Sequence, residues 1–464
     1  MQRMMSLQQA AQTLQGKINC SADAVCFTSV STDSRRVRLG DLFVALQGPN
    51  FDGHDFVAAA KANGACAAVV ARPVSVDIPL LQVSDTQLAL GRLGLAWRAQ
   101  FHGKLVALTG SNGKTTVKEM IAAILCQVSD QVLATQGNLN NEIGLPLTLL
   151  RLQPQHAYAV IEMGANHPGE IAYLSGLARP DVALITNAGP AHLQGFGDLD
   201  GVARAKGEIY GGLRADGIGI VNRDDQYADY WRHLIGSRQI VDFGFSQQAI
   251  VQGWVLDAAT NRIALRVADS NITIQLPLRG RHNLSNALAA AAAAHALGVS
   301  VAQIGSGLES VSPVSGRLEW LSGPFGSTLI NDTYNANPGS LAAAFTVTAN
   351  ANGQSYWLVL GDMAELGAAT EAAHEQAGMQ AREAGFEKLF ALGEQSRRAA
   401  DSFGSGAAHF ADARALANAL LVALRSAHSA PVVLIKGSRS MAMERIVKIL
   451  REELTAATTQ EAEH

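Results

Sequence analysis

The sequence is short of cysteine, of long hydrophobic runs and of excess charge, and each shortage excludes a class of protein. Its four cysteines form no Cys-x-x-Cys pair and stand among apolar residues, which predicts buried free thiols in a reducing compartment: Cys20, Cys26, Cys66 and Cys126. No window of about 18 apolar residues is present, which argues against a membrane-spanning helix. Glutamines interrupt the N-terminal segment where a secretory signal peptide would be apolar. We therefore expect a cytoplasmic protein.

The net charge is only −4 at pH 7, and charged residues make up 16% of the chain. Nothing in this balance indicates a nucleic-acid partner or a basic membrane-binding surface, and we expect neither. With 464 residues, of which 48% are hydrophobic, the chain is too long for one ordinary core and predicts roughly two to four globular domains.

From residue 105 onward, short apolar runs alternate with turns and helical patterns. This alternation predicts a doubly wound, mostly parallel α/β sheet. Its strands are expected at Leu105–Leu108, Val132–Ala134, Tyr158–Ile161, Val182–Ile185 and Ile218–Val221. Two later segments alternate apolar and polar residues and predict a small antiparallel side sheet: Ile263–Val267 and Ile272–Leu276.

The alternation restarts after residue 312, so we predict three α/β domains: a small one at 1–100, a central one at 101–312 and a Rossmann-like one at 313–464. The strands of the last domain are expected at Leu329–Ile330, Trp357–Leu360, Leu389–Ala391 and Val432–Ile435.

The string Thr109-Gly110-Ser111-Asn112-Gly113-Lys114-Thr115-Thr116 follows the first central strand and precedes an amphipathic helical pattern. A glycine turn between a strand and a helix N-terminus directs backbone N–H groups and the helix dipole at an anion. We expect Lys114 to reach the β- and γ-phosphates of ATP and the Thr115 hydroxyl to bind Mg²⁺. The string departs from the usual P-loop in one place, since Leu108 stands where its first glycine would be. The alternative is a glycine-rich turn without a ligand.

Two residues are expected beside this loop, because the carboxyl ends of parallel strands meet in one crevice. Glu162 ends a buried strand, and a buried carboxylate needs a cation, which favours a Mg²⁺ ligand over a capped structural glutamate. His192 follows the next strand in a Gly/Pro-rich loop, and one imidazole among oxygen ligands suits Mg²⁺, although a lone histidine is usually structural. Asn187 in the same loop is a candidate to orient a ligand or a water. Lys206, at an expected helix start, is by its residue context an ordinary surface lysine.

Several strings in this order resemble the Mur ligase family, from about residue 31 to about residue 444. They are the glycine loop, the Glu162 strand, the His192 loop, and Gly137-Asn-Leu-Asn-Asn141-Glu-Ile-Gly-Leu-Pro146, Glu162-Met-Gly-Ala-Asn-His-Pro-Gly-Glu170-Ile, Asp332-Thr-Tyr-Asn-Ala-Asn337-Pro-Gly-Ser340 and Leu360-Gly-Asp-Met-Ala-Glu-Leu-Gly367. The chain is most similar to the branch that adds D-alanyl-D-alanine to a UDP-N-acetylmuramoyl-tripeptide. The resemblance implies an ADP-forming amide ligase that works through an acyl phosphate, uses ATP and two Mg²⁺ ions, and acts as a monomer.

The resemblance also implies roles for single residues. Lys206 would be carbamylated by CO₂ and would bind the second Mg²⁺. Nucleotide contacts are implied for Asn283 beside His282, Arg317, Asp332, Asn335 and Asn337. Substrate contacts are implied for Ser34, Arg35, Asp52, Gly53 and His54 at the uridine nucleotide, for Asn138, Asn140 and Asn141, and for the pocket around Lys436–Arg439. For each of these residues the alternative is a structural role in its own loop, and for Asn283 it is an N-cap of the helix that follows.

Water would destroy an acyl phosphate, so we expect the domains to close about a hinge near residues 311–316 and to deliver Arg317 and Asp332. The branch that adds the third amino acid is less favoured, because its Asp-Asn-Pro-Arg motif is absent from the last domain. A folylpolyglutamate synthetase is disfavoured because the loop ends Gly-Lys-Thr-Thr. The alternative from another class of protein is a P-loop ATPase that acts as a molecular switch. The sequence does not identify the third residue of the tripeptide.

Overall fold

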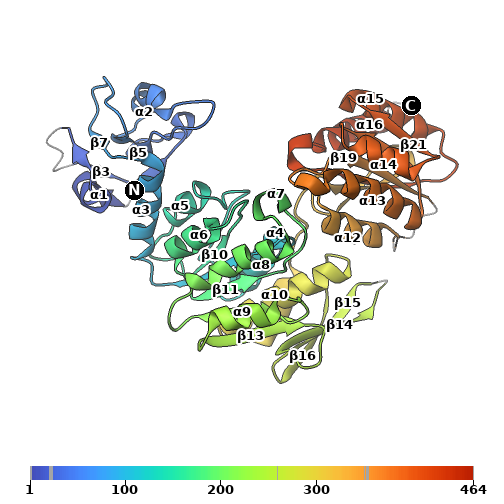
Figure 1. The fold of residues 1–464 in the computed structure, drawn as a ribbon, viewed down its shortest axis with the longest axis horizontal. Helices are drawn as coiled ribbons and strands as arrows, with labels where there is room; N and C mark the ends of the chain where they lie inside the picture. The colour runs from blue at the N-terminus through green and yellow to red at the C-terminus, as the bar shows by residue number, and fades with distance from the viewer. Residues whose placement is uncertain (1–2, 20–24, 259, 350, 352–354, 463–464) are drawn as a thin grey trace.

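The computed structural model describes residues 3–19, 25–258, 260–349, 351 and 355–462. These residues form three large sheets from successive parts of the chain. In Figure 1 the first lobe (blue) and the last (orange to red) lie on either side of the middle one (green and yellow). The mixed α/β architecture confirms the predicted fold class.

The first sheet has the strand order β2-β7-β6-β5-β4, parallel except where β2 meets β7. Helix α1 begins with a capping box, in which Ser6 and Gln9 each bind the other's backbone N–H. The elements are β1 (Met5–Ser6), α1 (Leu7–Leu14), β2 (Lys17–Ile18), β3 (Cys26–Phe27), β4 (Ser29–Ser31), β5 (Asp41–Val44), α2 (Val57–Ala62), β6 (Ala67–Val70), β7 (Leu80–Gln82) and α3 (Thr86–Arg98).

The middle sheet has the order β16-β15-β14-β13-β12-β11-β8-β10-β9. Its elements are β8 (Lys104–Thr109), α4 (Lys114–Cys126), β9 (Val132–Ala134), α5 (Gly144–Leu149), β10 (Tyr158–Glu162), α6 (Glu170–Ala178), β11 (Val182–Ile185), α7 (Leu193–Phe196), α8 (Leu199–Gly207), β12 (Ile218–Asn222), α9 (Ala228–Ile235), β13 (Gln239–Gly244), β14 (Val251–Asp257), β15 (Arg262–Val267), β16 (Ser270–Gln275), α10 (Arg281–Ala296) and α11 (Val301–Glu309). The five strands predicted for it are confirmed.

The antiparallel pairing predicted for the two side strands is confirmed, but these strands extend the main sheet and do not form a sheet of their own. Strands β15 and β16 are antiparallel, as expected, but β14 joins them to the main sheet through a short parallel pairing with β13, Phe243 to Val251 and Gly244 to Gln252. One continuous sheet results.

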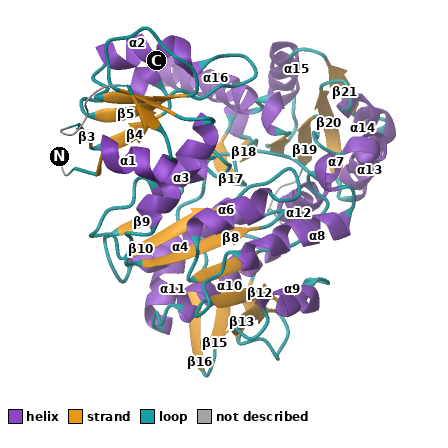
Figure 2. Cartoon of the chain, turned by 60° about the vertical axis from the view of Figure 1, so that its left-hand side comes forward, coloured by secondary structure: helices purple, strands orange, loops and turns teal. Residues whose placement is uncertain are grey.

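The parallel strands are mostly apolar and buried because helices cover both faces of the middle sheet. Helices α4, α10 and α11 pack on one face, and α5, α6, α8 and α9 on the other. The alanines of α10 between Ala287 and Ala294 are buried and let this helix lie close to the sheet (Figure 2). This packing fixes the strand ends that carry the candidate site.

The third sheet has the order β17-β18-β22-β19-β20-β21, parallel except where β17 meets β18. Its elements are β17 (Glu319–Ser322), β18 (Thr328–Asp332), α12 (Pro338–Ala349), β19 (Tyr356–Gly361), η5 (Gly367–Ala369), α13 (Thr370–Glu383), β20 (Phe386–Leu392), α14 (Ser396–Phe403), β21 (Ala407–Phe410), α15 (Ala413–Arg425), β22 (Val432–Lys436) and α16 (Glu444–Ala462). The four predicted strands are confirmed, and β17 and β21 are additional.

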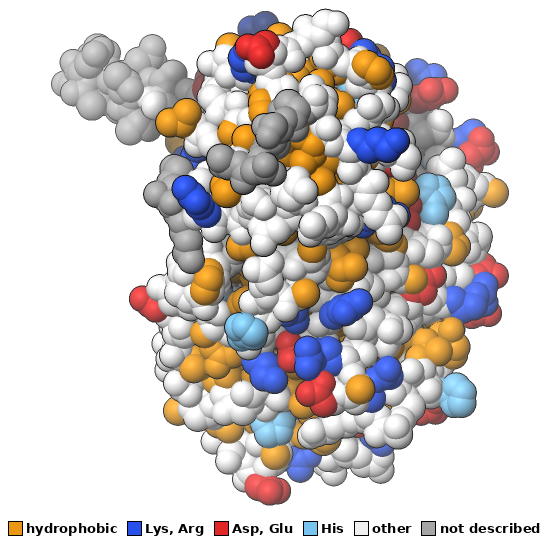
Figure 3. Space-filling view, turned by 90° about the vertical axis from the view of Figure 1, so that its left-hand side faces the viewer, with side chains coloured by type: hydrophobic (Ala, Val, Ile, Leu, Met, Phe, Trp, Pro, Cys, Tyr) orange, Lys and Arg blue, Asp and Glu red, His pale blue; other side chains and the backbone are white. Residues whose placement is uncertain are grey.

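The prediction of buried thiols is wrong. Cys126 is exposed, and Cys26 and Cys66 are partly exposed; Cys20 lies outside the described residues. Among the described helices, none has the length and apolar character needed to cross a bilayer. The face in Figure 3 carries basic and acidic side chains interspersed, without a broad field of one sign.

Candidate active site

The loop between β8 and α4 requires glycine at two positions. Gly110 has φ +150° and Gly113 has φ +81°. A Cβ on Gly110 would lie 1.9 Å from the Thr186 hydroxyl oxygen, and one on Gly113 would lie 2.3 Å from Asn286 Oδ1. A side chain at either position would displace the loop.

Residues that follow β10 and β11 hold this loop. The Asn112 N–H donates to Asn187 Oδ1 at 3.0 Å, and Asn187 Nδ2 donates to the Asn112 carbonyl at 3.1 Å. Ser111 Oγ donates to the Gly189 carbonyl at 2.9 Å, and Thr109 Oγ1 to the Met163 carbonyl at 2.8 Å. Asn187 thus fixes the loop backbone, a role that the sequence did not indicate.

Lys114 opens α4 and folds back over the loop, where its Nζ donates to the Gly110 carbonyl at 2.7 Å. Burial lowers the pKa of Lys114, and the charge of Glu162 opposes that shift. Thr116 is buried beside it, and the Thr115 hydroxyl accepts a hydrogen bond from Arg317 Nη2 at 2.9 Å.

Glu162 ends β10 and is buried at 1% exposure. Asn140 Nδ2 donates to its Oε1 at 2.8 Å, whereas its Oε2 has no hydrogen-bond partner among the described residues. Asn141 Oδ1 instead accepts from the N–H of Gly144, the first residue of α5, at 2.9 Å. An unpartnered carboxylate oxygen in the interior fits a cation ligand.

Lys206 is buried at 1% exposure, so the surface interpretation is wrong, and it lies near the end of α8, not at its start. Its Nζ has no hydrogen-bond partner in the described part of the chain and lies 5.3 Å from the Phe196 ring centre. Burial, assisted by the positive charge of Lys114, lowers the pKa of Lys206 to about 7. A neutral amine is the form that reacts with CO₂, so the residue fits the implied carbamate.

His192 adopts a left-handed backbone conformation with φ +55° at the start of α7. Its Nδ1 lies 2.5 Å from Oε2 of Glu365, which belongs to the third lobe. Sequence reasoning missed Glu365 as a site residue, although it lies in the string Leu360–Gly367 that carried the resemblance. No local pattern in the sequence links Glu365 to His192, which lies 173 positions earlier.

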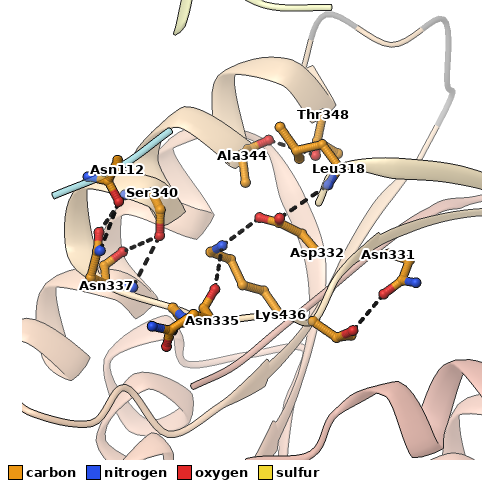
Figure 4. A network of polar contacts seen from close by, with 12 residues as sticks. Asn112, Leu318, Asn331, Asp332, Asn335, Asn337, Ser340, Ala344, Thr348 and Lys436 are labelled. Atoms are coloured by element: carbon orange, nitrogen blue, oxygen red, sulfur yellow. Dashed lines mark hydrogen bonds and ion pairs between the residues drawn. The ribbon is translucent and has the colours of Figure 1, made fainter. Parts of the chain in front are cut away.

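Two further side chains of the third lobe reach the glycine loop. Arg317 stacks on Tyr334, with its guanidinium carbon 4.0 Å from the ring centre, and donates to Thr115. Asn337 Nδ2 donates to Asn112 Oδ1 at 2.9 Å (Figure 4).

Asp332 and Lys436 form a buried ion pair behind these contacts. Lys436 Nζ lies 2.5 Å from Asp332 Oδ2 and donates to the Asn335 carbonyl at 2.9 Å (Figure 4). Asp332 Oδ1 accepts from the Leu318 N–H at 3.1 Å. Nearby, burial lowers the pKa of His282 to about 4. Asn335 Oδ1 accepts from the Ala336 N–H at 2.8 Å, within its own turn.

Asn283 is not the N-cap of α10, which is Gly280. It is the third helical residue; its Nδ2 donates to the Arg279 carbonyl at 2.8 Å, and its Oδ1 accepts from Asn286 Nδ2 at 3.1 Å.

The middle and third lobes together enclose a cavity of about 940 Å³. The predicted residues that line it are Ser111, Asn112, Gly113, Lys114, Thr116, Asn138, Asn140, Asn141, Glu162, Asn187, His192, His282, Asn283, Arg317, Asp332, Asn335, Asn337 and Lys436. Most of the predicted nucleotide and metal site is therefore brought to one space. Thr109, Gly110, Thr115 and Lys206 lie outside its lining.

The predicted uridine-nucleotide residues lie elsewhere, in and just before two short 3₁₀ helices of the first lobe, Ser34–Arg36 and Gly53–Phe56. Arg35 is exposed and pairs with Asp33 at 2.9 Å, beside Ser34. Asp52 accepts from the N–H of the buried His54, beside Gly53, at 2.9 Å. These residues do not line the cavity.

A parallel sheet with a phosphate loop at its carboxyl edge, covered by arginine from another domain, defines a nucleotide-dependent transferase or ligase. Models of three Mur ligase regions match the chain: the Mur ligase family catalytic domain at 27–97, the Mur ligase middle domain at 108–294, and the Mur ligase glutamate ligase domain at 316–439. The chain belongs to the Mur ligase family.

Two relatives that match nearly the whole chain carry the same name within that family. The UDP-N-acetylmuramoyl-tripeptide–D-alanyl-D-alanine ligase of Escherichia coli is 46% identical over 97% of this chain and 99% of its own, and that of Bacillus subtilis is 34% identical over 91% and 93%. Among solved structures, MurF from Acinetobacter baumannii matches with a TM-score of 0.90 and 38% identity over 96% of this chain and 98% of its own. MurF from Thermotoga maritima in complex with ADP matches with a TM-score of 0.80 and 29% identity over 92% and 98%.

Proposed function

We propose that this chain is an ATP-dependent amide ligase that adds D-alanyl-D-alanine to a UDP-N-acetylmuramoyl-tripeptide, giving the pentapeptide precursor of peptidoglycan, ADP and phosphate. The observation that carries the proposal is the shared cavity, where the phosphate loop, the unpartnered carboxylate of Glu162 and Arg317 of another domain face one space. The names of relatives that match nearly the whole chain support the choice of substrates.

The glycine loop would bind the β- and γ-phosphates of ATP through its N–H groups and through Lys114. Lys114 would exchange its hydrogen bond to the Gly110 carbonyl for one to a phosphate oxygen. The ribose and adenine would lie between α10 and the third domain, contacted by Asn283, Asp332, Asn335 and Asn337.

Attack of the tripeptide's terminal carboxylate on the γ-phosphorus would form an acyl phosphate and release ADP. Arg317 would stabilise the charge on the transferred group, because it reaches the loop directly. The D-alanyl-D-alanine amine would then attack the acyl carbon, and the tetrahedral intermediate would expel phosphate. Closure of the third domain about residues 311–316 would exclude water from these steps.

Thr115, Glu162 and His192, with Lys206 after its carbamylation, would hold two Mg²⁺ ions, which when bound offset the negative charge between ATP and the acceptor carboxylate. Within the described residues, no three His, Cys, Asp or Glu side chains form a ready-made cation site. The carbamate and the nucleotide phosphates would therefore supply the missing oxygen ligands.

Each of the three predicted domains would bind a different part of the substrates. Residues 1–100 would bind the UDP part of the substrate, 101–312 the ATP phosphates, and 313–464 the remainder of the nucleotide. The uridine nucleotide would contact Ser34, Arg35, Asp52, Gly53 and His54, and the peptide end would contact Asn138, Asn140 and Asn141. We expect a monomer in the cytoplasm, where ATP and nucleotide-linked precursors are found.

The test is mass spectrometry of the products formed from UDP-tripeptide, D-alanyl-D-alanine and ATP. The expected result is a gain of one dipeptide, with phosphate released only when both the acceptor and the amine are present. Lys114→Ala should abolish the product, whereas Lys448→Ala, at an exposed position of α16, should not. Phosphate release from ATP alone would instead indicate the ATPase switch, and transfer of a single amino acid in place of the dipeptide would indicate another branch of the family.

A further inference from the structure

The segment Met163–Glu170 joins β10 to α6 and carries a histidine and a carboxylate that the proposed steps do not use. Its start is fixed by the Gly164 N–H, which donates to the Asn140 carbonyl at 2.8 Å. Its end is fixed by the Gly169 N–H, which donates to Oε1 of Glu208, the residue that follows α8, at 2.8 Å. The segment is therefore held at both ends beside the candidate site.

The histidine and the carboxylate of this segment form a pair. His167 Nδ1 donates to Glu170 Oε1 at 3.0 Å, and the Asn166 N–H donates to Glu170 Oε2 at 2.8 Å. Burial would raise the pKa of Glu170, but these two hydrogen bonds outweigh it and hold that pKa below its usual range. Because a carboxylate can only accept, the ring proton lies on Nδ1 and the lone pair lies on Nε2. The imidazole is 68% exposed, so Nε2 is accessible to a bound molecule.

The imidazole lies at the part of the cavity where the acceptor carboxylate is expected. His167 lines the same cavity as Lys114 and Glu162. Its segment packs against α7, since a Cβ built on Gly195 would lie 3.4 Å from His167 Cδ2. The ring therefore lies between the strand end that carries Glu162 and the short helix that follows His192.

The second proposed step requires a proton acceptor at this place. The dipeptide amine must lose a proton as its nitrogen bonds to the acyl carbon, and histidine is the residue that most often takes such a proton. Within the described residues, three histidines line the cavity: His167, His192 and His282. His192 is assigned to the metal, and burial lowers the pKa of His282 to about 4, which makes it a weak base. His167 remains for this role.

We propose that His167 is the catalytic base of the amide-forming step and that Glu170 is a positioning residue that orients it. The nitrogen lone pair of the amine forms the new bond to the acyl carbon, and Nε2 of His167 takes one proton from that nitrogen. The tetrahedral intermediate then breaks its bond between the carbon and the phosphate oxygen. The imidazolium returns its proton to the departing phosphate, so the histidine ends neutral and the products are the amide and hydrogen phosphate. The inference rests on the proposed function, because it concerns the second step of that reaction.

The test compares two nucleophiles on the full-length chain with UDP-tripeptide, ATP and Mg²⁺. Hydroxylamine is uncharged near neutral pH and attacks acyl phosphates without a base, whereas D-alanyl-D-alanine needs one. In His167→Gln, kcat for dipeptide addition should fall by about a hundredfold or more, while hydroxamate formation, measured by mass spectrometry, should change little. An unchanged hydroxamate rate shows that phosphoryl transfer is intact. His102→Gln, at an exposed position outside the cavity lining, is the matched control and should change neither rate.

A double variant tests the role of Glu170. Glu170→Gln should lower kcat for dipeptide addition less than His167→Gln does. The two substitutions together should be no worse than His167→Gln alone, because Glu170 acts through the histidine. Losses that multiply in the double variant would show that Glu170 acts independently and would overturn its positioning role.

Three other results would decide against the base. Equal losses with both nucleophiles in His167→Gln would place His167 in the first step, and a raised KM for the dipeptide with unchanged kcat would make it a binding residue. Dipeptide addition at the rate of the unaltered chain would remove it from the reaction altogether. If the unaltered chain adds no dipeptide, the proposed function fails and the inference fails with it, whereas failure of the inference alone leaves dipeptide addition by the unaltered chain intact.

Discussion

Lys436 and Asp332 are separated by 104 positions in the sequence, yet their side chains meet 2.5 Å apart in the interior of the third domain. They are register partners at the carboxyl ends of the parallel strands β22 and β18. Lys436 also binds the carbonyl of Asn335, in the turn that carries Asn337 to the glycine loop. The ion pair therefore supports the part of the third domain that faces the phosphate site.

Removing only one charge of this pair should lower the stability of the third domain more than removing both charges. Lys436→Met leaves the Asp332 carboxylate buried without its cation, which costs about 3–5 kcal/mol, whereas Lys436→Met with Asp332→Asn removes both charges and should cost less. Hydrogen–deuterium exchange of the β18 and β22 peptides measures the effect locally. A double variant that exchanges faster than Lys436→Met would contradict this account.

The stability of the chain should depend on pH through Lys206. Its folded-state pKa of about 7 lies below the ordinary 10.5, so between these pH values the unfolded chain binds a proton that the folded chain does not. The free energy of unfolding should therefore rise with pH over this window, by up to about 1.4 kcal/mol per pH unit. Below pH 7 the cost of burying the amine is fully present.

Lys206→Met removes the titrating group, so in CO₂-free buffer its stability advantage over the unaltered chain should be largest near pH 6 and shrink toward pH 10. Chemical unfolding at several pH values measures this difference. The exposed Lys448→Met is the control and should show no such trend. A constant advantage at all pH values would contradict the lowered pKa.

The parts of the molecule that follow from local pattern were predictable. Strands β8, β10 and β11 are adjacent and parallel, so residues just beyond their ends had to share one edge. Lys114, Glu162 and His192 could therefore be placed together before their coordinates were known.

Contacts between distant segments were not predictable in this way. The residues around Glu365 do not indicate its contact with His192, and those around Thr115 do not indicate its contact with Arg317. Each contact depends on how two domains dock. The prediction that Lys206 is exposed failed for a related reason. Its neighbours in the sequence are typical of an exposed helix, but α8 turns this position toward Phe196 and the sheet. The pairing of β14 with β13 spans so few residues that no periodicity marked it.

Arg317 should contribute to the rate more than to nucleotide binding. Because it reaches Thr115 from the third domain, Arg317→Ala should lower kcat by about a hundredfold or more and change the affinity for ATP alone much less. Arg317→Lys should rescue little, since lysine cannot reproduce the planar stacking on Tyr334. The exposed Arg425→Lys is the control. Steady-state kinetics and calorimetric ATP titration separate the two effects, and an unchanged kcat with raised KM would contradict the assignment.

A reversible crosslink should report whether the third domain must open during turnover. A Cβ built on Gly367 lies 3.6 Å from Cβ of Gln194, within the range of about 3.5–4.5 Å found in disulfides. In Gln194→Cys with Gly367→Cys, we expect mild oxidation to join the two domains and a non-reducing gel to show the altered mobility. Gly367 has φ +57°, so its cysteine costs roughly 1–2 kcal/mol, which the single variant Gly367→Cys measures. Because substrates enter and products leave between the domains, oxidation should stop turnover and reductant should restore it, while both single variants stay insensitive to oxidant. If the crosslinked chain turned over as fast as the same chain after reductant is added, the contact between Gln194 and Gly367 would persist through the catalytic cycle.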